Sequence, residues 1–150
     1  VTLSLVDPDN RRPVDWTDRG ERLARVVAAE PALDLDDEKM RVTARALRVR
    51  REDPAAFVGE GTTYTGLVTS SPHALAFARG DADGLRVVTV ATVAAGLLAA
   101  GGGFGDAVVE LPPGSWRDVL ADGDDVITGG SVPLASLLAP RPVALLVRHS

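Results

Sequence analysis

The sequence predicts an α+β fold, with a helical piece over residues 1–58 and an antiparallel β-sandwich over residues 59–150. Two observations indicate this division. Before residue 59, apolar residues recur at helical spacing among charged ones. After it, glycine and other turn residues separate short runs rich in β-branched side chains. With 150 residues, 45% of them hydrophobic, the chain can bury a core as one domain or as a small domain with an appendage.

Two helices are expected in the N-terminal piece, after a short strand at residues 2–6 and a polar loop. For the first, at about 16–29, Asp15 is a candidate N-cap and Pro31 follows the end. Its apolar residues at helical spacing are Trp16, Leu23 and Val27. We expect Trp16 to be a core residue, and the arginines at positions 19, 22 and 25 to face away from the core.

The second helix is expected at about 36–52, where Pro54 ends it. Four acidic residues at positions 34, 36, 37 and 38 suit the start of a helix, because its dipole favours negative charge there. Its apolar stripe comprises Met40, Ala44 and Leu47. The many arginines beside this stripe predict a solvated or interdomain face.

The β domain is expected to contain short strands joined by tight turns. The predicted strands cover residues 62–68, 74–78, 85–92, 107–111, 115–121, 125–128 and 143–147. Turn residues cluster at 81–84, 112–114 and 122–125. Regular spacing of such strands is typical of an antiparallel sandwich or barrel.

Composition excludes several classes of function. The net charge of −5 disfavours nucleic acid as a partner, since phosphate binding needs clustered Lys and Arg. The chain has no cysteine, which rules out disulfides, Cys-ligated zinc and thiol catalysis, and an acidic domain of this kind fits the cytoplasm. The apolar run at 93–100 is interrupted by Gly96 and is too short to span a membrane.

The densest polar stretch lies near the N-terminus. It contains Asp7, Asp9, Asn10, Arg11 and Arg12. Arg–carboxylate pairs could lock this loop rigidly between two elements, or its side chains could contact a sugar. Calcium is disfavoured, because the run lacks the ligand spacing of known calcium loops.

Other candidate sites are weaker. The glycine-rich run 101–105 lacks the Gly-Lys-Ser/Thr ending of a phosphate loop and is better read as a hairpin connection. Neither His73 nor His149 lies in a context that suggests a catalytic triad. Trp116 is expected in the core, and would stack on a sugar only if it were exposed. These observations predict no catalytic residue, metal ligand or cofactor in the chain.

Several segments resemble maltooligosyl trehalose synthases, members of the alpha-amylase superfamily. LSLVDPDNRRPVD (3–15) resembles the segment that follows the last strand of the family's catalytic (β/α)8 barrel. KMRVTARALRVRRE (39–52) is similar to the helix that closes the barrel. HALAFARG (73–80), RVVTV (86–90), VELPPGSWRDVL (109–120) and PVALLVR (142–148) resemble its C-terminal β domain. Residues 94–100 and 103–106 depart from the family's pattern.

The resemblance implies a C-terminal fragment: residues 1–58 as the tail of the barrel, then the β domain. The family converts the reducing-end α-1,4 linkage of a maltooligosaccharide to α,α-1,1 by intramolecular transglucosylation. Its catalytic carboxylates come from barrel strands that this sequence does not contain, so the chain alone is expected to be inactive. The implied partners are the missing barrel and, in the complete enzyme, a maltooligosaccharide, with Asp7, Asp9, Asn10, Arg11 and Arg12 as substrate contacts.

Two other interpretations stay open at this point. The chain could be a stand-alone carbohydrate-binding β module with a helical appendage. It could also be a purely structural domain, in which case the two helices should expose an apolar patch.

Overall fold

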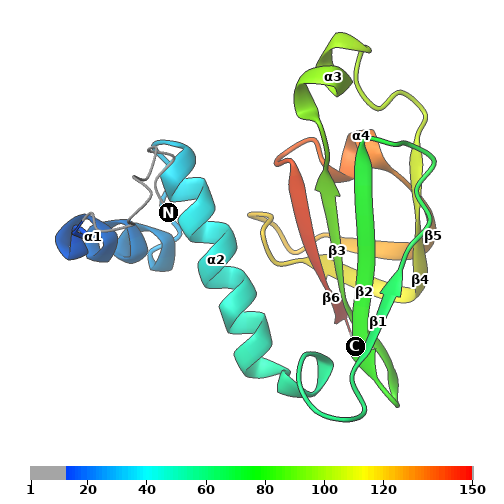
Figure 1. Ribbon diagram of the computed structural model, residues 1–150, viewed down its shortest axis with the longest axis horizontal. Coiled ribbons are helices and arrows are strands. Elements are labelled where there is room, and N and C mark those ends of the chain that lie inside the picture. Colours follow the sequence, from blue (N-terminus) through cyan, green and yellow to red (C-terminus); the bar gives the residue numbers. More distant parts are fainter. Residues whose placement is uncertain (1–12, 150) are drawn as a thin grey trace. The chain divides into compact units, whose positions relative to one another are not determined.

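The computed structural model describes residues 13–149 (Figure 1). The chain divides into two compact units, Val1–Arg48 and Val49–Ser150. The strand expected at 2–6 lies outside the described residues. The assignment of residues 1–58 to a barrel tail and of 59–150 to a β domain stays a prediction.

Both expected N-terminal helices are present. Helix α1 covers Trp16–Val27, and the side chain of Asp15 caps it by accepting a hydrogen bond from the Asp18 N–H at 3.0 Å. Helix α2 covers Leu35–Glu52, with three acidic residues in its first turn and two arginines in its last. This charge distribution follows the helix dipole and stabilises both ends.

The prediction that Trp16 is a core residue is wrong, because its side chain is 77% exposed. The apolar side chains Leu23, Val27 and Leu47 are exposed as well. Arg22 and Arg25, expected to face away from the core, instead bind carboxylates at the start of α2. Within the described part of the first unit, α1 and α2 are therefore held together largely by charged groups, and an apolar stripe is left exposed.

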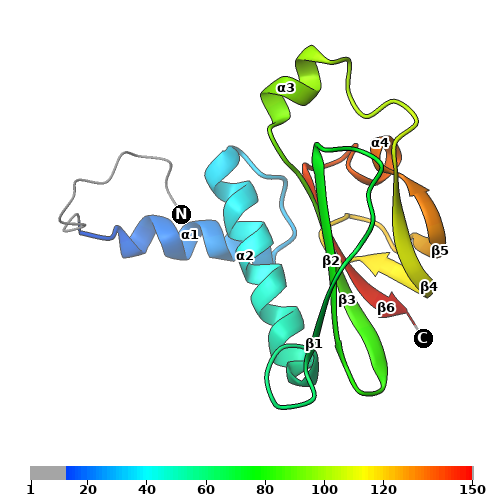
Figure 2. The ribbon, with the colours of Figure 1, turned by 45° about the vertical axis from the view of Figure 1, so that its right-hand side comes forward.

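The second unit is built on one six-stranded antiparallel sheet with the strand order β1-β2-β3-β6-β4-β5. The strands are β1 (Thr63–Gly66), β2 (Ala74–Asp81), β3 (Gly84–Thr92), β4 (Val108–Asp118), β5 (Val126–Pro133) and β6 (Val143–His149). Figure 2 shows β6, in red, passing between β3 and β4. The antiparallel pairing is confirmed, and all six strands belong to one continuous sheet.

The sheet curls, so that segments far apart in its strand order meet. Residues 68–70, just after β1, pair with the first half of β4 through the hydrogen bonds Ser70 N to Val108 O and Glu110 N to Val68 O, each 2.9 Å long. The second half of β4 pairs with β6. The bent strand β4 therefore pairs with residues 68–70 along its first half and with β6 along its second half.

The bend in β4 lies at Pro112, Pro113 and Gly114, where the sequence predicts a turn between two strands. That prediction is wrong, since one strand runs through the bend and the three residues form a bulge opposite Gly129. A Cβ atom on Gly129 would lie 2.1 Å from the Pro112 carbonyl oxygen, so only glycine leaves room for the bulge.

The core lies inside the curled sheet. It comprises alternate residues of the strands, such as Ala76 and Ala78 of β2 and Val88 and Val90 of β3, together with Trp116. Three short helices were not predicted: η1 (Pro54–Ala56), α3 (Ala95–Ala100) and α4 (Leu134–Leu137). The predicted turn at 81–84 is confirmed as the β2–β3 hairpin.

Candidate functional site

The residues that the sequence predicts as substrate contacts cannot be placed. Asp7, Asp9, Asn10, Arg11 and Arg12 lie outside the described residues. Their proposed role stays a prediction, and the candidate site described below is built from other residues.

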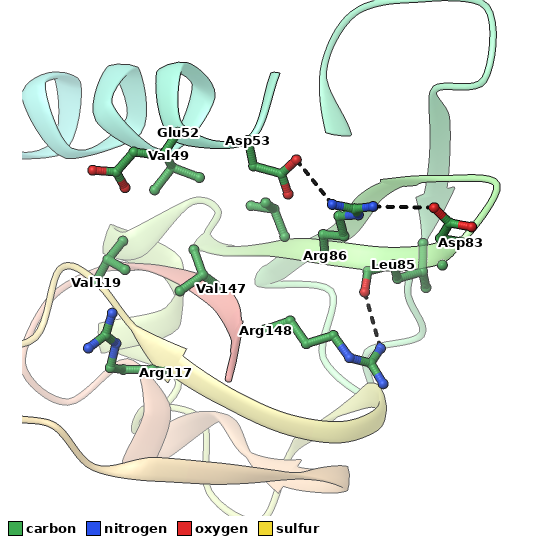
Figure 3. Close-up of a pocket in the computed structure, with 12 residues that line it drawn as sticks. Val49, Glu52, Asp53, Asp83, Leu85, Arg86, Arg117, Val119, Val147 and Arg148 are labelled. Carbon is green, nitrogen blue, oxygen red and sulfur yellow. Dashed lines mark hydrogen bonds and ion pairs between the residues drawn. The ribbon is translucent and has the colours of Figure 1, made fainter. Parts of the chain in front are cut away.

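The second unit contains an open cleft of about 450 Å³ (Figure 3). Four segments line it: the last turn of α2 with Asp53, residues 83–87 at the start of β3, the end of β4, and the end of β6. The lining residues are Val49, Glu52, Asp53, Asp83, Gly84, Leu85, Arg86, Val87, Arg117, Val119, Val147 and Arg148. The volume lies within the range of roughly 300–1,000 Å³ that is typical of small-molecule sites.

Arg86 is the centre of an ion-pair network on one wall of the cleft. Its guanidinium lies 2.8 Å from Asp81, 3.4 Å from Asp53 and 3.6 Å from Asp83. The hairpin that carries Asp81 and Asp83 is ordered by a hydrogen bond from the Asp83 N–H to the Asp81 carboxylate at 3.0 Å. The network joins the end of α2 to the β2–β3 hairpin and occupies two of the three carboxylates that line the cleft.

A second arginine is fixed by the core. Arg148 donates a hydrogen bond to the Leu85 carbonyl at 3.2 Å, and its guanidinium lies 5.9 Å from the centre of the Trp116 ring. Trp116 is fully buried and donates from Nε1 to the Pro112 carbonyl at 2.9 Å. The expectation that Trp116 is a core residue is confirmed, so it offers no exposed ring for a sugar.

The remaining charged groups of the cleft are less constrained. Among the described residues, Glu52 makes no hydrogen bond or ion pair, and Arg117 pairs at 3.5 Å with Asp124, whose side chain is 95% exposed. In Figure 3 the apolar side chains Val119 and Val147 lie between Glu52 and Arg117. The cleft therefore combines an apolar floor with two charged walls. The Glu52 carboxylate accepts hydrogen bonds on one wall, and the Arg117 guanidinium donates them on the other.

Asp118 holds the strand end that carries Arg117 and Val119. Its Oδ1 accepts hydrogen bonds from the Leu120 N–H at 2.9 Å and the Leu145 N–H at 3.1 Å. Burial raises the pKa of the Asp118 carboxyl above its ordinary value, although the two hydrogen bonds oppose this shift. The side chain thus ties β4 to β6 beside the cleft.

The first unit contains a separate cluster around Asp37, of which only 2% is exposed. Its carboxylate accepts from Arg22 at 2.7 Å, from Arg25 at 2.9 Å and from the Leu33 N–H at 3.0 Å. Arg22 also binds Asp34 at 2.8 Å. The Arg25 guanidinium, the Leu33 N–H and Arg22 together lower the pKa of Asp37 to about 2. The charged groups of this cluster are paired with one another, and these ion pairs link α1 to the start of α2.

The structure brings together residues that sequence reasoning did not connect. Arg86, Arg117 and Arg148 are far apart in the sequence and meet through the strand order of the sheet, and Glu52 joins them from the last turn of α2. Within residues 13–149 there is no group of three potential metal ligands, and no helix has the length and apolar character needed to cross a membrane. Neither histidine lines the cleft.

The chain is similar to known proteins along almost all of its length. Proteins from two strains of Mycobacterium tuberculosis, whose names ascribe to them maltooligosyl trehalose synthase activity, are 41% identical over 98% of this chain. Solved structures of maltooligosyltrehalose synthase from Arthrobacter ramosus, unmutated and mutant, match 97% of the chain at 38% identity with a TM-score of 0.80. This chain spans only 17–18% of the length of these relatives. No family model matches it.

Proposed function

We propose, because the chain is homologous to one part of maltooligosyl trehalose synthases, that it is the C-terminal part of an enzyme of this kind. The complete enzyme would move the reducing-end glucose of a maltooligosaccharide from an α-1,4 to an α,α-1,1 linkage. The observation that carries the proposal is the agreement of sequence and fold over nearly all of this chain.

In this proposal the chain supports catalysis without performing it. Transglucosylation with retention needs one carboxylate as nucleophile and one carboxylic acid that shuttles protons. We assign neither role to this chain and place both in the catalytic barrel, the proposed partner. The polar loop from Asp7 to Arg12 would contribute substrate contacts. A cytoplasmic location remains part of the proposal.

The exposed apolar side chains of the first unit support this view. Trp16, Val27, Leu33, Leu35 and Leu47 are each more than half exposed. Soluble proteins rarely leave so many large apolar groups uncovered in one region. The relatives contain more than four-fifths of their length outside the matched segment. We propose that the barrel formed by that additional sequence covers these side chains.

The proposal is tested with two proteins: this chain alone, and a longer protein that includes the coding sequence upstream of it. Both are incubated with maltohexaose, and reducing ends are measured over time. We expect the longer protein to consume reducing ends without releasing glucose in equal amount, and this chain to consume none. Loss of reducing ends with the chain alone would contradict the proposal, as would an inactive, well-folded longer protein.

The exposed stripe also fits a second candidate, a structural module that acts by covering other helices. If the chain is a structural module, these side chains should pack against other helices of the longer protein, and the longer protein should show no activity. The activity assay above therefore distinguishes the two candidates.

A further inference from the structure

The cleft of the second unit is the feature that the proposed function leaves without a role. We propose that it is a binding site for maltooligosaccharide. The choice of an α-1,4-glucan as ligand rests on the proposed function, whereas the choice of an uncharged polyhydroxylated ligand rests on the cleft itself.

The floor of the cleft suits a sugar ring. Val49, Leu85, Val87, Val119 and Val147 contribute apolar side chains to its lining. A pyranose ring presents C–H groups on its faces and hydroxyl groups around its rim. Its face would displace water from the apolar floor while its rim reaches the charged walls.

The charged groups on the walls favour a ligand without net charge. A carboxylate such as Glu52 only accepts hydrogen bonds, and a guanidinium such as Arg117 only donates them. An anion would be attracted by Arg117 and repelled by Glu52. A cation would be attracted by Glu52 and repelled by Arg117. A hydroxyl group both donates and accepts, so a sugar can satisfy both walls at once.

Most of the cleft is fixed before a ligand binds. Arg86 is held by the carboxylates of Asp81 and Asp53, and Arg148 is held by the Leu85 carbonyl and the Trp116 ring. Glu52 and Arg117 are left for the ligand, because the Arg117–Asp124 pair is exposed and contributes little. A site that is already ordered loses less conformational entropy on binding.

The test is a titration of the isotope-labelled chain with maltohexaose, followed by NMR. We expect the largest amide shifts at Gly84, Leu85, Val119 and Val147, and a saturable binding curve. Glu52→Ala and Arg117→Ala should each weaken binding about tenfold or more, because each removes a hydrogen bond to a charged group. The control is Glu60→Ala, which removes an exposed carboxylate outside the cleft and should leave the affinity unchanged.

Three outcomes would overturn the proposal. The first is a well-folded chain that shows no shifts with maltohexaose. The second is a set of shifts centred on the exposed Tyr64 and its stacked neighbour Phe77, which lie outside the cleft. The third is stronger binding of inorganic sulfate than of maltohexaose to the same amides. The titration measures binding to this chain alone, whereas the activity assay measures turnover by the longer protein. A negative titration would therefore overturn the binding site without overturning the proposed function.

Discussion

Replacement of Trp116 by alanine should be among the most destabilising single changes in the second unit. The side chain is fully buried and its Nε1 binds the Pro112 carbonyl in the bulge of β4. Truncation of a buried tryptophan to alanine costs about 3–5 kcal/mol. The lost hydrogen bond adds about 1 kcal/mol, so we expect a total of about 4–6 kcal/mol. Domains are stable by only about 5–15 kcal/mol, so this variant should be close to unfolding.

The measurement is urea-induced unfolding followed by far-UV circular dichroism, which does not depend on tryptophan fluorescence. Trp116→Phe keeps an aromatic ring but loses the indole N–H, and should cost less than the alanine change. The matched control is Trp16→Ala, since that indole is 77% exposed and its loss should change stability by no more than about 0.5 kcal/mol.

A cost below about 1 kcal/mol for Trp116→Ala would refute the assignment of Trp116 to the core. A second refutation would be a Trp116→Ala variant that keeps its stability but no longer binds maltohexaose. That result would restore the interpretation in which this ring stacks on a sugar.

Two further predictions concern the carboxylates of Asp37 and Asp118. Asp37→Asn should loosen the α1–α2 pair and lower helicity at 222 nm. In the parent chain the folded pKa of about 2 lies below the unfolded value near 3.8, so this stabilisation is complete above about pH 4 and is lost as the pH falls toward 2. An acid titration that is identical for both proteins would contradict this. Asp118→Ala should cost about 1–3 kcal/mol, because it leaves the N–H groups of Leu120 and Leu145 without their acceptor. Asp118→Asn keeps an oxygen acceptor at this position and removes the ionisable group. Burial raises the pKa of the Asp118 carboxyl in the folded protein, so its ionisation lowers the free energy of unfolding as the pH rises through that pKa. The Asp118→Asn variant should therefore be at least as stable as the parent at pH 7 by thermal unfolding, and a large loss would show that the charge is needed.

Local patterns in the sequence predicted most of the secondary structure. Asp15 and the acidic start of α2 are signals that act within one helical turn, and both were interpreted correctly. The sequence predicts a turn at Pro112–Gly114 where the structure has a bulge, because a proline–glycine run is compatible with both. What decides between them is Gly129, on a different strand, where the absence of a Cβ atom admits the bulge.

The face that a helix buries could not be predicted from its apolar spacing alone. Trp16 and Val27 have the spacing of a buried stripe, yet both are exposed, while Arg22 binds Asp37. Apolar spacing shows which residues share a face but not whether any surface covers that face. The sequence does not reveal the cleft, for a related reason. Arg117 and Arg148 become neighbours only through the pairing of β4 with β6, and Glu52 joins them from the end of α2.

The central position of β6 has a consequence for how the protein is made. This strand follows the other five in the sequence, yet it pairs with both β3 and β4 in the interior of the sheet. During synthesis, β1–β3 and the β4–β5 pair emerge from the ribosome before the strand that lies between β3 and β4. The sheet cannot be completed until residues 143–149 have been released. A ribosome that stalls before that point would leave unpaired the edges of β3 and β4 to which β6 binds, and these edges are open to pairing with other chains.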